Sequence, residues 1–361
     1  MEIKDIARRI LPYGYISQRY NARNFELERL IQESDDVIDL SISELSKFKT
    51  IVSVQGFGYS GSGAVVDLLR EYSNCQVIGY VSVEGSKTSK KASMAEVDII
   101  RLSGGLFEIE NYIDSTNAFH NNALINRTIK LFASSPLSRI PEIQKLYVSF
   151  LKTIIDFSIP NLSKPYYNGY LYNPGDQSSI YFLKQMTKEQ FRIICGNFLN
   201  HIFNYFHSQG CDYFVADQLY SDGIFDMHRN QSYTHNLKVI FIPRDPRDLY
   251  AWTNYKKVEW IPQKLEAFIK WYKIMYRNLH DCKSDALIIQ YEGMCLDYEN
   301  ECKKVVKFLG LDERMHTSKC QCFNPDSSKR FVNLWKTSNM PTKDFDQIKS
   351  ELSEYCTSLI D

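Results

Sequence analysis

Short runs of β-branched and aromatic residues alternate along the chain with segments of helical hydrophobic spacing. Such runs are typical of buried strands, and apolar residues three and four apart are typical of amphipathic helices. The expected strands cover residues 50–54, 76–83, 96–102, 213–216, 238–243 and 286–291. The expected helices cover residues 24–31, 37–40, 64–72, 191–206 and 265–272. This alternation predicts an α/β fold with a parallel sheet covered by helices on both faces.

The length of 361 residues suits one large domain with insertions, or two domains. We expect a helical extension over residues 1–48, a main domain over 49–340 and a C-terminal helix over 341–361. The main domain would contain a mostly helical insertion at about residues 110–210. Within that insertion, residues 160–179 are a loop dense in tyrosine, proline and glycine. Tyrosine rings beside amides often hold sugars, and simple packing of a lid is the alternative.

A glycine-rich segment, Gln55-Gly56-Phe57-Gly58-Tyr59-Ser60-Gly61-Ser62-Gly63, joins the first expected strand to the helix that follows it. Glycines allow a tight turn, and the free N–H groups at a helix start point toward a ligand. Ser60 and Ser62 add hydroxyl donors. The segment therefore predicts a site for a phosphate or sulfate group, and a tight turn without a ligand is the alternative.

The same glycines permit a second interpretation of the ligand. Gly56, Gly58 and Gly61 fit the dinucleotide pattern G-x-G-x-x-G, and Glu84 follows the next strand about where a ribose-binding acid would stand. A nicotinamide- or flavin-binding oxidoreductase is therefore an alternative. The segment is not a Walker A loop, because Ser62 occupies the position that this motif reserves for lysine.

A second charged motif, Arg244-Asp245-Pro246-Arg247-Asp248, stands at the end of an expected strand. Its two arginines offer planar, permanently charged groups suited to phosphate, and its aspartates can cap a helix or orient the arginines. Ligands of parallel sheets bind at the carboxyl ends of the strands, where both motifs fall. The alternative is a pair of surface salt bridges in a turn.

Composition narrows the class of protein further. Lysine plus arginine and aspartate plus glutamate both number 43, so a nucleic-acid partner is not indicated. The nine cysteines contain no C-x-x-C pair, which indicates free thiols in a reducing compartment and no metal site. No signal peptide or transmembrane run is visible. We therefore expect a cytoplasmic protein, with peripheral membrane contact left open and the oligomeric state undetermined.

Three motifs in order resemble the sulfotransferases that use 3′-phosphoadenosine 5′-phosphosulfate (PAPS), in particular bacterial-type carbohydrate sulfotransferases. They are Gly58-Tyr59-Ser60-Gly61-Ser62-Gly63, then Arg244-Asp245-Pro246-Arg247-Asp248, then Gln290-Tyr291-Glu292-Gly293-Met294 followed by Val305-Val306-Lys307-Phe308-Leu309-Gly310-Leu311. The resemblance extends from about residue 50 to residue 336. It implies a three-layer α/β/α, P-loop-like fold with helical insertions.

The resemblance also implies a reaction and a set of binding residues. A sulfuryl group would pass from PAPS to a hydroxyl or amine of a glycan or glycolipid, leaving adenosine 3′,5′-bisphosphate, without a metal. The N–H groups of residues 59–63 would bind the phosphosulfate, Arg244 the 3′-phosphate, and Lys329 and Arg330 would belong to a closing segment. The co-substrate residues implied are Gly58, Tyr59, Ser60, Gly61, Ser62, Gly63, Ala64, Arg244, Arg247, Lys329 and Arg330.

Two positions depart from the family pattern. Tyr59 stands where a lysine usually assists the leaving nucleotide, and Trp252 stands where many relatives have a serine on the 3′-phosphate. A sulfotransferase-like protein that binds without catalysis is therefore a further alternative. Relatives take their general base from the region beyond the second strand, which implies Glu96 as the base, with Glu84 and His120 next.

Overall fold

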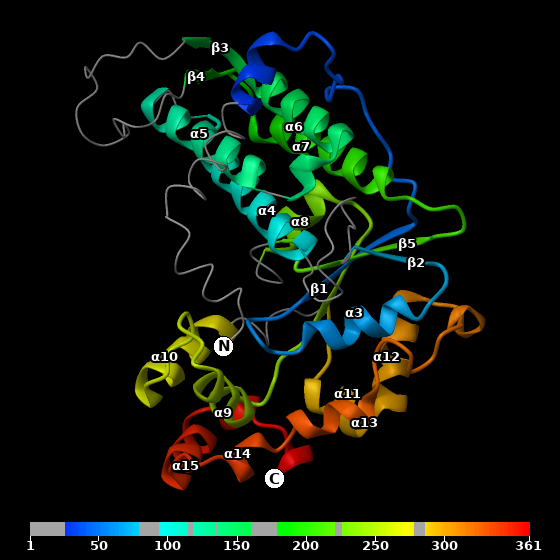
Figure 1. The fold of residues 1–361 in the computed structure, drawn as a ribbon, viewed down its shortest axis with the longest axis vertical. Coiled ribbons are helices and arrows are strands. Elements are labelled where there is room, and N and C mark those ends of the chain that lie inside the picture. The colour runs from blue at the N-terminus through cyan, green and yellow to red at the C-terminus, as the bar shows by residue number, and fades with distance from the viewer. Residues whose placement is uncertain are drawn as a thin grey trace, which may run out of the picture. The chain divides into compact units, whose positions relative to one another are not determined.

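The structure is a computed structural model that describes residues 26–78, 94–114, 118–134, 136–159, 179–220, 226–277 and 286–361 (Figure 1). The chain divides into two compact units. The first unit comprises Met1–Ser46, Tyr80–Tyr205 and Ser232–Thr234, and the second comprises Lys47–Gly79, Phe206–Gln231 and His235–Asp361.

A five-stranded parallel sheet is the centre of the second unit. Its strands are β1 (Thr50–Gln55), β2 (Cys75–Ile78), β5 (Tyr213–Asp217), β6 (Leu237–Phe241) and β7 (Ala286–Ile288), in the order β2-β5-β1-β6-β7. Every neighbouring pair is parallel. The expected α/β class with a parallel sheet is thus confirmed for this unit.

Helices cover both faces of this sheet. Successive side chains of a strand point to opposite faces, so a strand of mostly apolar residues needs cover on both. Val52 and Val54 of β1 share one buried cluster with Leu68 of α3 (Ser62–Arg70). On the other face, the ring of Phe241 lies 5.8 Å from that of Tyr276 in α10. Besides α3 and α10 (Leu265–Tyr276), the second unit contains α9 (Pro246–Lys256), α11 (Tyr291–Leu296), α12 (Tyr298–Leu309), α13 (Pro325–Ser328), α14 (Leu334–Thr337) and α15 (Thr342–Glu351), and also most of α8 (Met227–Tyr233).

The first unit is mostly helical, as expected for the insertion. It contains α4 (Met94–Tyr112), α5 (Ala118–Ser134), α6 (Pro141–Ile154) and α7 (Lys188–Tyr205). Stacked aromatic rings fill its core, including Phe132 on Tyr147 and Phe150 on Phe198. An antiparallel pair, β3 (Ile155–Ile159) and β4 (Ile180–Leu183), was not expected from the pattern.

Two expected elements are wrong, and a third is shorter than expected. Residues 96–102 belong to helix α4, not to a strand. Seven partly alternating residues are too few to distinguish a strand from a helix. Further along the same helix, the buried residues Leu106, Ile109 and Glu110 have helical spacing. Residues 37–40 are not helical, and the last strand ends at Ile288, because Tyr291 begins α11.

Some expectations fall outside the described residues. These are Glu84, the continuation of the second strand beyond Ile78, and residues 160–178 of the tyrosine-rich loop. The domain boundaries also stay a prediction. Within the described ranges, no helix is both long enough and apolar enough to cross a membrane.

Candidate functional site

The glycine-rich loop between β1 and α3 has a left-handed backbone at three positions. The φ angles are +37° at Gly58, +59° at Tyr59 and +103° at Gly61. No acceptor within the described part of the chain receives the backbone N–H groups of residues 59–63. The N–H of Ala64, in contrast, donates to the carbonyl of Gly61 at 2.9 Å. A turn with several uncommitted N–H groups at a helix start is a concave site for an anion.

The packing of the loop explains most of its glycines. A Cβ on Gly56 would overlap the Ser60 hydroxyl, and one on Gly58 would overlap the Trp260 ring. A Cβ on Gly61 would overlap the ring of Tyr291. Gly63 differs, because a Cβ there would meet no described atom within 4 Å. Three glycines are therefore required by neighbouring groups, and the fourth faces open space in the first turn of α3.

The hydroxyl of Ser62 is committed within the protein. It donates to Oδ2 of Asp217, at 3.2 Å, and Asp217 is the last residue of β5. The side chain of Ser62 therefore connects the loop to the neighbouring strand. Asp217 was not identified from the sequence as a site residue.

Arg244 lies directly after β6 and is only 4% exposed. Its Nη1 donates to the carbonyl of Tyr59 at 3.2 Å, and its Nη2 donates to the carbonyl of Phe331 at 2.5 Å. Its guanidinium lies 5.0 Å from the ring centre of Tyr291. Within the described residues, Arg244 forms no ion pair and its buried Nε has no acceptor. The fold therefore places a buried cation, without an ion-pair partner among the described residues, beside the glycine-rich loop.

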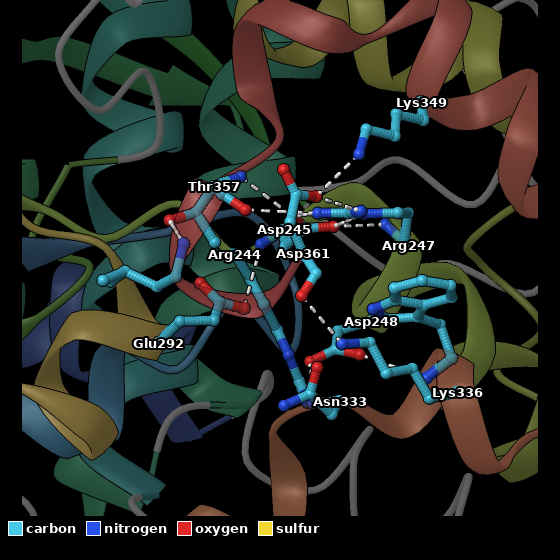
Figure 2. Close-up of polar contacts among 12 residues, drawn as sticks. Arg244, Asp245, Arg247, Asp248, Glu292, Asn333, Lys336, Lys349, Thr357 and Asp361 are labelled. Carbon is cyan, nitrogen blue, oxygen red and sulfur yellow. Dashed lines mark hydrogen bonds and ion pairs between the residues drawn. The ribbon is translucent and has the colours of Figure 1, made fainter.

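Arg247 has the opposite environment, although it is only three residues away. It is 1% exposed, and its guanidinium pairs with Asp245 and Asp361, both at 2.8 Å. It also donates to the carbonyl of Thr357 and stacks on the ring of Trp335. Figure 2 shows this network, which joins the start of α9 to the C-terminal residues.

Asp248 holds the segment that reaches Arg244. Its carboxylate accepts the N–H groups of Asn333 at 2.8 Å and Trp335 at 3.1 Å (Figure 2). Burial raises the pKa of Asp248, against the effect of these hydrogen bonds and of the Arg244 charge. Asn333 has a φ of +64°, so the chain turns sharply between Phe331 and α14. Asp248 thereby positions the carbonyl that accepts from Arg244.

Glu292 is fully buried at the start of α11 and contacts the Arg244–Asp248 motif. Its Oε1 accepts the N–H of Asp245 at 3.1 Å. Burial, together with the charge of Asp245, raises the pKa of Glu292 from 4.5 to about 8. Glu292 therefore connects the third sequence motif to the second one.

Several predicted residues come together in the second unit, and others cannot be placed. The segment that carries Lys329 and Arg330 lies at Arg244 through Phe331, although Lys329 itself pairs with Asp326 at 2.8 Å. The ring of Trp252 contacts that of Phe331 edge-to-face, at 5.4 Å. Glu96 belongs to α4 and His120 to α5, and their side chains, like Glu84, lie outside the described part.

Two neighbours of the loop were missed by sequence reasoning. Tyr291 belongs to the third motif, but the sequence does not reveal that its ring packs under both Gly61 and Arg244. Trp260 carries no motif at all. Only the clash that a side chain on Gly58 would produce identifies its role.

Comparison with models of known protein families and with curated proteins finds no match to this chain. The described residues contain no group of three or more histidine, cysteine or acidic side chains suited to a metal ion. The geometry joins the glycine-rich loop to the guanidinium of Arg244, which donates to the carbonyl of Tyr59.

Proposed function

We propose that this protein is a PAPS-dependent sulfotransferase with a three-layer α/β/α, P-loop-like fold. The sulfuryl group passes to a hydroxyl or amine of an acceptor, which is a glycan or glycolipid. Adenosine 3′,5′-bisphosphate is the nucleotide product.

The observation that carries the proposal is the contrast between the two arginines of the second motif. A buried charge is costly unless it is paired, and Arg247 is paired with two carboxylates. Arg244 is equally buried but has only carbonyl acceptors among the described residues. Its environment therefore favours an anion, and its contact with Tyr59 puts that anion next to the loop. A nucleotide with phosphates at both the 3′ and 5′ positions would supply two anions to such a receptor.

The order of the strands supports this proposal over a dinucleotide enzyme. Numbered by their place in the chain, the parallel strands have the order 2-3-1-4-5. The dinucleotide-binding order begins 3-2-1-4, with the second strand directly beside the first. In this sheet β5 lies between β1 and β2. The G-x-G-x-x-G glycines therefore stand in a different sheet topology from the one that the oxidoreductase interpretation requires.

The proposed reaction is an in-line transfer. The bond between sulfur and the oxygen bridging to the 5′-phosphate breaks, a new bond forms from sulfur to the acceptor atom, and the acceptor proton passes to a general base. Charge develops on the departing phosphate, so donors fixed in advance lower the barrier. The N–H groups of residues 59–63 fit this role, because no acceptor in the described chain uses them. With Tyr59 in place of lysine, these N–H groups carry more of this stabilisation.

One observation favours a second candidate, a phosphotransferase that uses a magnesium nucleotide. The Ser62 hydroxyl contacts Asp217 at the end of the strand beside β1. In P-loop enzymes a loop serine or threonine and an aspartate hold Mg²⁺ together. The missing lysine weighs against this candidate, because P-loop enzymes use that lysine to bind the β- and γ-phosphates.

Isothermal titration with adenosine 3′,5′-bisphosphate, AMP, NAD and Mg²⁺–ATP tests the proposal. We expect adenosine 3′,5′-bisphosphate to bind most tightly. Arg244→Ala should weaken its binding by about 1.5–3 kcal/mol, the loss of charged hydrogen bonds. Arg314→Ala is the matched control, since Arg314 is an exposed arginine paired with Asp312. Tighter binding of NAD or Mg²⁺–ATP, or unchanged affinity in Arg244→Ala, would reject the sulfotransferase.

A further inference from the structure

Two aromatic rings stand exposed at the glycine-rich loop. The rings of Tyr59 and Trp260 are stacked, with centroids 6.0 Å apart and planes 22° from parallel. Tyr59 is 49% exposed and Trp260 is 60% exposed. Exposed aromatic residues are common on protein surfaces, but two stacked rings form a contiguous apolar patch, and such patches often mark binding sites.

The pair is fixed in place by the loop itself. Gly58 lacks a side chain at the position where the Trp260 ring lies, so the ring can approach the backbone. Tyr59 adopts a φ of +59°, which is unfavourable for a bulky residue. Its carbonyl is held by Arg244 at 3.2 Å. Strain of this kind persists where surrounding contacts enforce it, which is common at ligand sites.

We propose that the Tyr59–Trp260 pair is the acceptor platform, on which one sugar ring of a saccharide is stacked. This inference rests on the proposed function, and it specifies which residues hold the acceptor. Tyr59 is part of the loop that would hold the phosphosulfate, so a sugar on its ring lies beside the group to be transferred.

The exposure of the rings favours a sugar over a phenol or another apolar acceptor. Apolar small molecules bind in enclosed pockets that remove most of their surface from water. A sugar needs only one C–H face on an aromatic ring, while its hydroxyls stay hydrated. Rings that are 49% and 60% exposed suit the second kind of ligand.

The test is a binding titration in the presence of adenosine 3′,5′-bisphosphate. The probes are maltose, cellobiose and N,N′-diacetylchitobiose, with 4-nitrophenol as the apolar comparison. We expect at least one disaccharide to bind, and Trp260→Ala to weaken it about tenfold, the scale of a lost aromatic contact. Tyr255→Ala is the control, because Tyr255 is also an exposed aromatic residue, at 76% exposure, but does not contact the loop glycines. Its disaccharide affinity should match that of the wild type.

Nucleotide affinity, measured on the same variants, separates the platform from the loop. If Trp260→Ala also weakens adenosine 3′,5′-bisphosphate binding, Trp260→Leu decides, since leucine fills the space at Gly58 without an aromatic face. Equal disaccharide affinity in Trp260→Leu and the wild type overturns the inference, as does binding of 4-nitrophenol alone or of no probe. Failure of the wild type to bind the nucleotide rejects the sulfotransferase instead, and disaccharide titration without nucleotide then still decides the platform.

Discussion

Arg244 and Arg247 show how environment, not residue type, assigns a role. Both side chains are buried, both belong to one turn, and both touch an aromatic ring. Arg247 is neutralised by Asp245 and Asp361. Arg244 has no such partner in the described chain, so the energy of burying its charge is available to a ligand anion.

The contrast predicts different effects on folding. Arg247→Ala should lower the free energy of unfolding by about 3–5 kcal/mol, because it leaves the carboxylate of Asp245 buried without its charge partner. Arg244→Ala should lower it much less. Urea denaturation of both variants, with Arg314→Ala as the surface control, measures the difference. A larger loss in Arg244→Ala than in Arg247→Ala would contradict this assignment.

Glu292 predicts a pH dependence of stability. Its pKa is raised to about 8 in the folded protein, chiefly by burial, against 4.5 when unfolded. Between these values the folded state holds a proton that the unfolded state releases, so the free energy of unfolding falls as the pH rises from about 4.5 to about 8. The Glu292 contribution is a few kcal/mol. Urea denaturation at several pH values should show a weaker pH dependence of the free energy of unfolding in Glu292→Gln than in the wild type. An unchanged pH dependence would show that Glu292 is not its source.

Glu96 stays the predicted general base. Glu96→Gln keeps the shape and removes the proton acceptor, so turnover should fall by about two to four orders of magnitude. Binding of adenosine 3′,5′-bisphosphate should hardly change. Steady-state assays of Glu96→Gln, with His120→Asn as the comparison, test this. If His120→Asn loses turnover and Glu96→Gln keeps it, the role belongs to His120.

At the scale of the element, two glycines of the β1–α3 segment should respond in opposite ways to substitution by alanine. Gly61 has a φ of +103° and lies against Tyr291, so Gly61→Ala should destabilise the fold by at least about 2 kcal/mol. Gly63 lies in α3 and faces open space, so Gly63→Ala should stabilise it by about 0.5–1 kcal/mol. Thermal unfolding without ligand measures both effects.

The same pair tests the loop as a ligand site. If the phosphosulfate occupies the space in front of Gly63, Gly63→Ala should bind adenosine 3′,5′-bisphosphate more weakly despite its higher stability. Gain in stability with unchanged nucleotide affinity would place the anion elsewhere on the loop.

At the scale of the molecule, the sheet predicts where the second unit is most resistant to opening. β1 is hydrogen-bonded on both sides, to β5 and β6, and its residues 51–55 are buried. β7 is an edge strand of three residues, and Ile288 is 37% exposed. Hydrogen exchange should therefore be slowest in β1 and clearly faster in β7. Equal protection of the two strands in a mass-spectrometric exchange experiment would contradict this hierarchy.

The sequence by itself determined the elements whose pattern is local. Strands β1, β5 and β6 are short, apolar and bounded by turn residues, and α7 and α10 have a sustained helical period, so all were located from residue spacing. The glycine-rich loop and the Arg244–Asp248 turn were located in the same way, because special backbone angles and helix caps demand particular residue types.

Only the tertiary structure decided what depends on partners far apart in the chain. Residues 96–102 are helical because they belong to a helix of 19 residues, whose period outweighs a brief alternation. Strand order is set by which edges meet, and no residue type encodes it. Arg247 has one local partner, Asp245, but its second carboxylate partner, Asp361, and the Phe331 carbonyl that accepts from Arg244 lie 114 and 87 residues away along the chain. Whether a buried charge is paired depends on which residues the fold brings next to it. The sequence therefore identified both arginines, and the fold separated their roles.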